Sequence, residues 1–374
     1  MRVVVVSHSY VVAMNQQKLE ALAQRNGIVL TLIVPPAWKD MGKRISLQKW
    51  SSERYQILPV KIYLKYHLYA YFYAPWKFFI QMMRIRPHII YVEQEPQCIS
   101  AFQSAVLSRF CKSKFVFLSW ENLKVKFPLW KKFLAWFVLN SADYAITGNE
   151  GAKQILQDKG YQGKIAVIPQ FGIDERVFKS KKDEGLKRRL GLKSSFIIGF
   201  IARLLKEKGI LTLIEAVSYL EGEYQVLIVG EGEAKTEGVE LARKLQVLER
   251  LVFAGVIKHQ ELRDYINCLD VLVLPSLTTL YWKEQFGHVL IEAMACEVPV
   301  IGSDSGAIPE IIGDAGLIFP EGDAKELAEK ISILMSDSSV RNSLRNKGRQ
   351  RVLERFTTDS VVDRLFAVLK KTVG

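Results

Sequence analysis

Short apolar runs alternate with amphipathic helical spacing along the whole chain. In the first half, these runs predict strands near 2–7, 28–34, 56–62, 88–92, 114–119, 142–147 and 164–168. In the second half, they predict strands at 196–202, 224–230, 251–255, 270–275, 298–303 and 316–320. Continuously apolar strands separated by helices are typical of parallel sheets that are covered on both faces. The pattern therefore predicts an α/β fold.

The pattern breaks near the middle, in "IPQFGIDERVFKSKKDEG" at 168–185. There, proline, glycine and a run of charged residues interrupt both the strand pattern and the helix pattern. A chain of 374 residues is longer than one core usually supports, so we expect two domains. The N-terminal domain is expected over 1–168 and the C-terminal domain over 169–355. The amphipathic segment 356–374 is expected to cross back to the N-terminal domain. Two doubly wound parallel sheets facing a central cleft would bind ligands at the carboxyl ends of their strands.

Composition and cysteine usage favour a folded protein of a reducing compartment. The chain is 49% hydrophobic and 24% charged, as is usual for globular proteins. Its first apolar run, in "MRVVVVSHSY", is too short for a signal peptide or a membrane span, so we expect no export. The cysteines at 98, 111, 268 and 296 show no CxxC spacing, as expected of reduced thiols in a cytosolic protein.

The net charge of +13 arises in the first half of the chain. Residues 1–170 contain 23 Lys and Arg against 9 Asp and Glu, whereas the remainder contains 29 against 30. This excess indicates an anionic partner, and basic residues mixed with aromatic ones at 61–86 and 124–139 suit an anionic bilayer interface. Core helices with a solvated basic edge are the alternative. Nucleic acid is disfavoured because no nucleic-acid-binding motif accompanies these charges.

The densest candidate chemistry lies in "YWKEQFGHVLIEAMACEVPVIGSDSG", at 281–306. Helical spacing begins at about Phe286, between Glu284 and Glu292. A helix N-terminus exposes N–H groups that can bind a phosphate oxygen, and Gly287 would let a ligand approach closely. A carboxylate inside the helix needs hydrogen bonds, which ligand hydroxyls would provide. The stretch fits a nucleotide sugar; alternatively, one Glu caps its own helix and the other pairs with a Lys or Arg.

A second group of candidates favours the nucleotide sugar. In "GFIARLLKEKGI", Arg203 and Lys208 follow the first strand of the second domain, where phosphate-binding groups collect in doubly wound folds. Two cations there would neutralise the charge that develops on a departing diphosphate. The turn "LIVGEGEAK", with Gly230 and Gly232, is weak evidence alone because it lacks the third glycine of a dinucleotide site.

Together, these residues resemble glycosyltransferase family 4, the group 1 glycosyltransferases, which are retaining enzymes of the GT-B architecture with two Rossmann-like domains. The resemblance spans about residues 168–336 and includes "ARLLKEKG", "VGEGE", "FAGVIKHQEL", the Glu284 and Glu292 pair, and "SDSGAIPEIIGDAGLIFPEGD". It implies a nucleotide-diphosphate sugar donor, UDP- or GDP-linked, bound by the C-terminal domain. Arg203 and Lys208 would hold the diphosphate and Glu284 the transferred sugar, so these three are the expected catalytic residues.

The resemblance implies further contacts to donor and acceptor. Glu292 would hold the ribose. The other expected donor-binding positions are Gly230, Val256, Ile257, Phe286, Gly287, His288 and Val289. His288 departs from the usual family residue, and it could instead simply cover the helix surface. In the acceptor-binding N-terminal domain, "SHSYVVAMNQQK" lacks the family's glycine-rich turn. The acceptor candidates there are His8, Glu95, Glu121 and Asn122, without an assigned general base.

The resemblance also implies retention at the sugar carbon through front-face attack. Because the sequence contains no Asp-x-Asp, we expect metal-independent transfer without a cofactor. The expected protein is a cytoplasmic hexosyltransferase, peripheral on the inner face of the plasma membrane. It would act on a lipid-linked or polysaccharide acceptor in cell-envelope or exopolysaccharide synthesis. The alternatives are a non-hydrolysing sugar-nucleotide epimerase and a non-catalytic module that binds a nucleotide sugar or nucleic acid.

Overall fold

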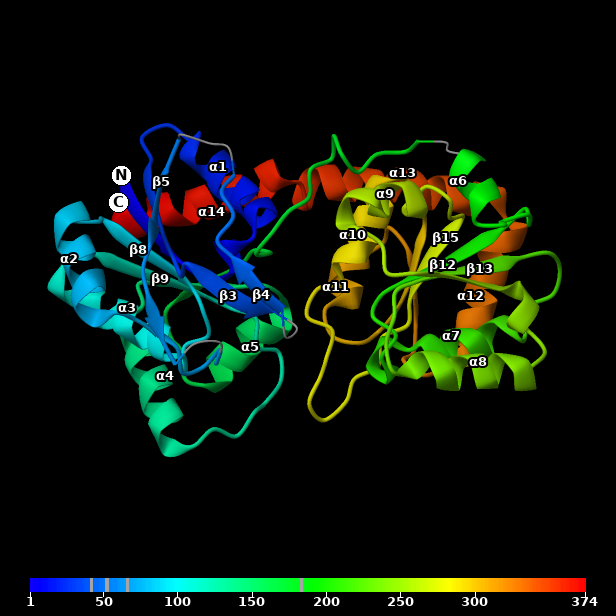
Figure 1. The fold of residues 1–374 in the computed structure, drawn as a ribbon, viewed down its shortest axis with the longest axis horizontal. Coiled ribbons are helices and arrows are strands. Elements are labelled where there is room, and N and C mark those ends of the chain that lie inside the picture. The colour runs from blue at the N-terminus through cyan, green and yellow to red at the C-terminus, as the bar shows by residue number, and fades with distance from the viewer. Residues whose placement is uncertain (41–42, 51–53, 65–66, 182–183) are drawn as a thin grey trace. The chain divides into compact units, whose positions relative to one another are not determined.

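The protein forms two compact units in the computed structural model (Figure 1). The structure describes residues 1–40, 43–50, 54–64, 67–181 and 184–374. Parts of the predicted basic aromatic stretch 61–86 and of the predicted connection 168–185 therefore lie outside the described residues. Unit 1 consists of Met1–Gly172 together with Thr358–Gly374, and unit 2 consists of Ile173–Thr357.

Unit 1 is built on a seven-stranded parallel sheet with the order β11-β10-β9-β8-β1-β2-β5. Its strands are β1 (Arg2–Val6), β2 (Val29–Val34), β5 (Gln56–Pro59), β8 (Ile89–Glu93), β9 (Lys114–Ser119), β10 (Tyr144–Thr147) and β11 (Lys164–Val167). Each strand predicted for this half is present. The central strands are buried on both faces, as their continuous apolar runs indicate, and the valines of 3–6 have no exposed surface.

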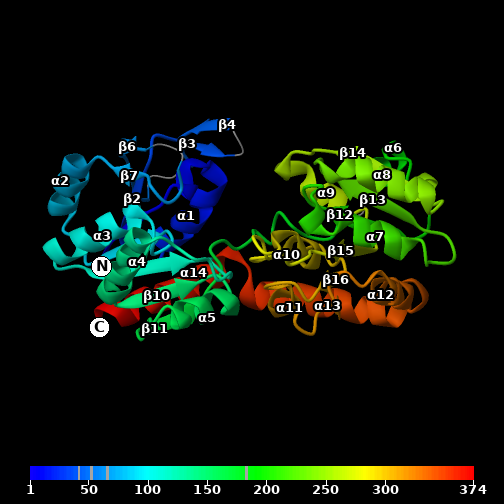
Figure 2. The same cartoon turned by 90° about the horizontal axis from the view of Figure 1, so that it is seen from below.

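Helices cover both faces of this sheet. They are α1 (Gln17–Ala23), α2 (Pro75–Ile85), α3 (Ile99–Phe110), α4 (Leu129–Ser141), α5 (Glu150–Asp158) and α14 (Thr358–Val373). The last helix of the chain, α14, packs against α1, and its apolar side chains Val362, Leu365 and Leu369 belong to the core of unit 1. On the opposite face, α3 packs against α4 (Figures 1 and 2).

Two antiparallel hairpins of unit 1 were not predicted. One pairs β3 (Ala37–Asp40) with β4 (Lys43–Ser46), and the other pairs β6 (Ile62–Tyr63) with β7 (Phe72–Tyr73). These strands are two to four residues long and lie outside the main sheet. They lack the long apolar runs that mark strands buried within a parallel sheet.

Unit 2 contains a six-stranded parallel sheet with the order β14-β13-β12-β15-β16-β17. The strands are β12 (Ile197–Ile201), β13 (Gln225–Val229), β14 (Leu251–Gly255), β15 (Val271–Leu274), β16 (Val300–Ser303) and β17 (Leu317–Phe319). All six were predicted, so the expected α/β fold with two doubly wound sheets is confirmed. The strand order reverses between β12 and β15, and ligands of such sheets bind outside the carboxyl ends of strands at this switch point.

The helices of unit 2 lie on both faces of its sheet. They are α6 (Glu184–Arg189), α7 (Ile210–Val217), α8 (Ala234–Lys244), α9 (Leu262–Ile266), α10 (His288–Ala295), α11 (Ile308–Ile312), α12 (Ala324–Ser336) and α13 (Ser338–Arg355). α7 packs against α8 and α12, whereas α10 packs against α9 and α13 on the other side of the sheet (Figure 1). Among the described residues, none of the helices combines the length and the hydrophobicity that crossing a bilayer requires.

The chain passes between the units twice, once at Gly172 and once at Thr357. The two segments that make these passages are hydrogen-bonded to each other through their backbones. The N–H of Ile173 donates a hydrogen bond of 2.9 Å to the carbonyl of Phe356, and Ile173 forms an isolated parallel bridge with Thr357.

Candidate functional site

The loops that follow β12, β13 and β14 meet at the carboxyl edge of the unit 2 sheet. The N–H of Gly230, just after β13, donates a hydrogen bond of 2.8 Å to the carbonyl of Gly255 at the end of β14. Gly230 has φ 134°, and a Cβ there would lie 2.0 Å from the carbonyl oxygen of Ala202. Only glycine lets the backbone at 230 lie this close to the backbone at Ala202. The exposed residues Arg203 and Val256, which follow Ala202 and Gly255, therefore lie at the same edge of the sheet.

Lys208 and Glu284 form an ion pair at this edge. Lys208 ends the short 3-10 helix η3 (Lys206–Lys208), and its Nζ lies 2.7 Å from Oε2 of Glu284. The buried hydroxyl of Ser276 donates a 3.0 Å hydrogen bond to the same oxygen. The Lys208 Nζ also lies 4.3 Å from the ring centre of Trp282. The loop after β12 and the loop after β15 thus present a cation and a carboxylate together at the switch point.

The backbone at Glu284 is held by the loop that follows β16. The N–H of Ala307 donates a 3.0 Å hydrogen bond to the carbonyl of Glu284. Gly306 has φ 60°, and a Cβ there would lie 2.0 Å from that carbonyl oxygen and 3.0 Å from the Glu284 nitrogen. Side chains at position 306 would therefore displace the segment that carries the carboxylate.

Helix α10 begins at His288, two residues later than predicted, because Gly287 adopts a left-handed conformation with φ 78°. The N-cap residue is this glycine, which has no side chain to bond the first amides. Glu284 lies before the helix, and its Oε2 pairs with Lys208. Since α10 follows a strand of a parallel sheet, its amino end lies at the carboxyl edge with Glu284. Phe286 is buried, which leaves its backbone as the part that a ligand could contact.

Glu292 lies inside α10 and is 6% exposed. None of the described residues donates a hydrogen bond to its carboxylate, and Nε2 of the exposed His259 is 3.9 Å from its Oε1. Burial raises the pKa of Glu292 to about 7. A buried carboxyl group without donors is costly unless a ligand supplies them, and sugar hydroxyls would do so. The pairing of this glutamate with a Lys or Arg is not seen in the described part of the chain.

Replacing Glu292 by glutamine is expected to stabilise the ligand-free protein at about pH 8 and to have little effect at about pH 5. The pKa of this carboxyl rises from 4.5 to about 7 on folding, so the folded protein holds a proton that the unfolded chain releases. The free energy of unfolding of the unchanged protein therefore falls as pH rises between these two values, by up to about 3 kcal/mol. Urea unfolding across this pH range measures the effect.

The exposed Glu297, just after the same helix, provides the matched control through Glu297→Gln. If the Glu292→Gln protein and the unchanged protein differed by the same free energy of unfolding at every pH, burial would not govern the titration of Glu292.

The remaining expected donor residues lie at the same edge of unit 2. Ile257 and Val289 are half-buried, and His288 is exposed with its ring centre 4.7 Å from that of Phe286. Arg203 follows β12 directly, and no described residue pairs with its guanidinium. Ser276, Trp282 and Gly306 were not among the expected site residues. Trp282 and Gly306 do lie within 281–306, the stretch with the densest candidate chemistry, whereas Ser276 lies just before it.

In unit 1, His8 follows β1 and is partly buried. Its Nδ1 is hydrogen-bonded to the amide of Gln94, and its ring centre lies 4.4 Å from that of Trp38. Burial lowers the pKa of His8 to about 4, although the charge of Glu93 acts in the opposite direction. His8 is therefore neutral at physiological pH, and its ring can exchange hydrogen bonds but carries no positive charge.

Glu95 and Glu121 lie together at the carboxyl edge of unit 1 but are engaged by the protein. Glu95 accepts hydrogen bonds from the Ser119 hydroxyl at 2.6 Å and from the backbone N–H of Glu121 at 3.1 Å. Burial, followed by the charge of Glu121, raises the pKa of Glu95. Glu121 is 9% exposed and pairs with Lys159. Asn122 follows in the loop and is half-buried.

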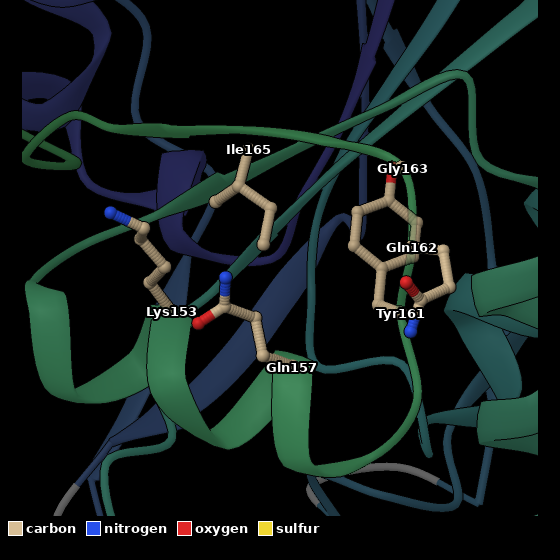
Figure 3. Close-up of a pocket in the computed structure, with 6 residues that line it drawn as sticks. All are labelled: Lys153, Gln157, Tyr161, Gln162, Gly163 and Ile165. Carbon is tan, nitrogen blue, oxygen red and sulfur yellow. The ribbon is translucent and has the colours of Figure 1, made fainter.

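A surface hollow of about 390 Å³ lies on unit 1, between α5 and the turn that leads into β11 (Figure 3). It is lined by Lys153, Gln157, Tyr161, Gln162, Gly163 and Ile165. None of the expected site residues lines it. The turn precedes β11, so the hollow lies at the amino edge of the sheet, away from the edge where ligands of such folds bind. Within the described ranges, no group of three or more His, Cys, Asp or Glu residues could hold a metal ion.

Curated relatives, of which two are described, match part of the chain. The N-acetyl-alpha-D-glucosaminyl L-malate synthase of Bacillus anthracis is 31% identical over 195 residues, which cover 51% of this chain and 49% of that protein. The capsular polysaccharide biosynthesis glycosyltransferase CapM of Staphylococcus aureus is 34% identical over 178 residues, which cover 46% of each. The chain thus spans about half the length of these relatives.

The fold is similar to that of solved glycosyltransferase structures. The structure of Anabaena Alr3699/HepE in complex with UDP matches with a TM-score of 0.77 at 17% identity, covering 99% of this chain and 100% of that chain. The chain accordingly has the GT-B architecture. The family model described as glycosyl transferases group 1 matches residues 182–351, the segment that contains Lys208, Glu284 and Glu292. This segment belongs to the group 1 glycosyltransferases.

Proposed function

We propose that this protein is a glycosyltransferase that moves a sugar from a nucleotide-diphosphate sugar to a glycan acceptor in cell-envelope or exopolysaccharide synthesis. One observation carries the proposal: the Lys208–Glu284 pair lies at the same sheet edge as the amino end of α10, and the buried Glu292 inside that helix pairs with no described Lys or Arg. HepE, which shares the fold, has been solved with UDP and with UDP-glucose. CapM, by its name, acts in capsular polysaccharide biosynthesis.

The donor is proposed to lie along the carboxyl edge of unit 2. Arg203, Lys208 and the first amides of α10 bind the diphosphate, because cations and helix N-termini attract anionic oxygens. Glu284 accepts hydrogen bonds from hydroxyls of the transferred sugar, and Glu292 accepts them from the ribose. The backbone of Gly230 and the residues Val256 and Ile257 flank the base, and Gly287, His288 and Val289 contact the sugar and the phosphates.

The transfer is proposed to retain the configuration of the sugar carbon. The acceptor hydroxyl attacks that carbon from the face that the diphosphate leaves, and its proton passes to a departing phosphate oxygen. Arg203 and Lys208 stabilise the charge that grows on the leaving group, which is the step where fixed cations contribute most. Under this proposal the two side chains supply the positive charge, and transfer proceeds without a metal ion or other cofactor.

The acceptor is proposed to be a lipid-linked or polysaccharide glycan bound by unit 1. His8 and Asn122 offer groups for acceptor hydroxyls at the carboxyl edge of that unit. Glu95 and Glu121 already accept hydrogen bonds from the protein, so their role is to position the loop after β9. The proposed location is cytoplasmic and peripheral, on the inner face of the plasma membrane.

A panel of UDP- and GDP-linked sugars tests the proposal by thermal stabilisation, because a ligand that binds only the folded state raises the apparent stability. We expect one donor to stabilise the protein and its transfer product to keep the donor's anomeric configuration by NMR. Activity should persist in chelator. If the protein converts the donor alone to an epimerised sugar, the epimerase is favoured. If no donor of the panel stabilises the protein, the proposal is contradicted.

A further inference from the structure

The outer surface of three helices in unit 1 exposes large apolar side chains. We call this surface the aromatic face, and it comprises Trp76 on α2, Phe110 on α3, and Leu129, Trp130, Phe133 and Trp136 on α4. Their exposed fractions range from 49% to 82%. Single exposed apolar residues are normal on a protein surface, but so many on three neighbouring helices indicate an interaction site.

Ring contacts join the exposed aromatic side chains into two groups, one between α2 and α3 and one between α3 and α4. Trp76 stacks on Phe79 with ring centres 6.0 Å apart, and Phe79 contacts Phe110 at 6.3 Å, which links α2 to α3. Phe102 of α3 lies 6.2 Å from Phe133 of α4. Figure 2 shows α2, α3 and α4 close together on unit 1. The exposed rings therefore lie in two groups that share α3 and are not isolated positions.

The same helices carry only positive charge. Their sequences contain no Asp or Glu, and their basic residues are Lys77, Arg84, Arg109, Lys131 and Lys132. None of these five forms an ion pair with a described residue. Where an apolar surface lies among unpaired cations, long Lys and Arg stems can lie along the apolar groups while their charged ends reach an anionic layer.

We propose that the aromatic face docks unit 1 onto an anionic lipid bilayer. Trp and Phe rings suit the depth of the headgroups, and each cation near an anionic surface strengthens binding about fivefold. A second copy of this chain is a poorer occupant, because two such faces would bring like charges together without any acidic residue to pair them. The charge and the rings together match a lipid surface.

The aromatic face continues into the carboxyl edge of unit 1. The Phe127 ring centre lies 5.3 Å from the Nζ of Lys131, at the start of α4, and 5.5 Å from the Nζ of Lys159. Lys159 in turn pairs with Glu121. Docking would therefore bring the bilayer close to the acceptor candidates. If the proposed transferase function holds, this arrangement favours a lipid-linked acceptor over a soluble polysaccharide.

Co-sedimentation with vesicles tests the docking surface. The full chain is expected to bind vesicles of phosphatidylcholine mixed with phosphatidylglycerol, to bind pure phosphatidylcholine far less, and to be released as salt shortens the Debye length below about 10 Å. The double variant Lys77→Glu/Lys132→Glu should bind at least about 25-fold more weakly. The control Lys193→Glu/Lys325→Glu changes the net charge equally on unit 2 and should bind almost normally.

A second pair of variants tests the rings. Trp136→Glu should weaken binding about tenfold or more, whereas Leu353→Glu, at a 45% exposed position of α13, should not. Equal loss in both members of either pair would overturn the proposal, as would a protein that stays in the supernatant at low salt. A dimer in light scattering that Trp136→Glu dissociates would assign the face to a second copy and overturn it as well. Thermal stabilisation by the donor is measured in the same variants. If the donor still stabilises a variant that no longer binds vesicles, only the docking surface has been affected and the proposed function is untouched.

Discussion

Replacing Lys208 by alanine is expected to lower kcat by about two to three orders of magnitude, the usual cost of removing one fixed group that stabilises developing charge. The Nζ of Lys208 is held at the switch point by Glu284 and lies over the Trp282 ring. Its interaction with the leaving diphosphate should strengthen in the transition state, so kcat should fall more than KM rises. Steady-state kinetics with the donor that stabilises the protein measure both constants.

Lys206→Ala is the matched control. Lys206 lies in the same 3-10 helix, but its Nζ pairs with Glu237 on the exposed surface of α8. It should keep nearly full turnover. Equal kcat values for the two variants would contradict the role given to Lys208. Because Lys208→Ala leaves the buried Glu284 without its cation, it should also lose on the order of 3 kcal/mol of stability. Kinetics must therefore be measured well below its unfolding temperature.

Gly306→Ala is expected to lower turnover by about two orders of magnitude, because a displacement of about 1 Å in a positioning group can cost that much. The new Cβ would lie 2.0 Å from the Glu284 carbonyl oxygen, so the backbone that carries this carboxylate must move. The left-handed φ of 60° adds a conformational cost of about 1 kcal/mol. Turnover and urea unfolding of the same protein separate the two effects.

Gly160→Ala isolates the steric part of this effect. Gly160 has φ 88°, but a Cβ there would meet nothing within 4 Å. Both variants should share the conformational cost, and only Gly306→Ala should lose turnover. Comparable turnover in the two would show that the loop after β16 does not position Glu284.

The main strands could be predicted because strands buried on both faces leave continuous apolar runs in the sequence. β12 and β15 are examples, since their residues are almost entirely buried. The hairpin of β3 and β4 left no such signal, because it is short and β4 is largely exposed. The start of α10 was misplaced by two residues because the apolar period cannot reveal the left-handed conformation of Gly287.

The chemistry of the candidate site was only partly visible in the sequence. The types and loop positions of Arg203, Lys208 and Glu284 indicated an anionic ligand. Their partners could not be predicted, because the Lys208–Glu284 pair joins residues 76 positions apart through the folding of two loops. Likewise, nothing in the local sequence indicated that Glu95 would be saturated by backbone and hydroxyl donors.

The return of the chain through α14 has a consequence for how this protein can be altered. Unit 2 is an insertion within the sequence of unit 1, so replacing it with the corresponding part of a relative requires two junctions, near Gly172 and Thr357. A premature stop codon just after the second junction would remove α14 and with it the buried Leu365 and Leu369. The damage would then fall on the half of the protein that is translated first.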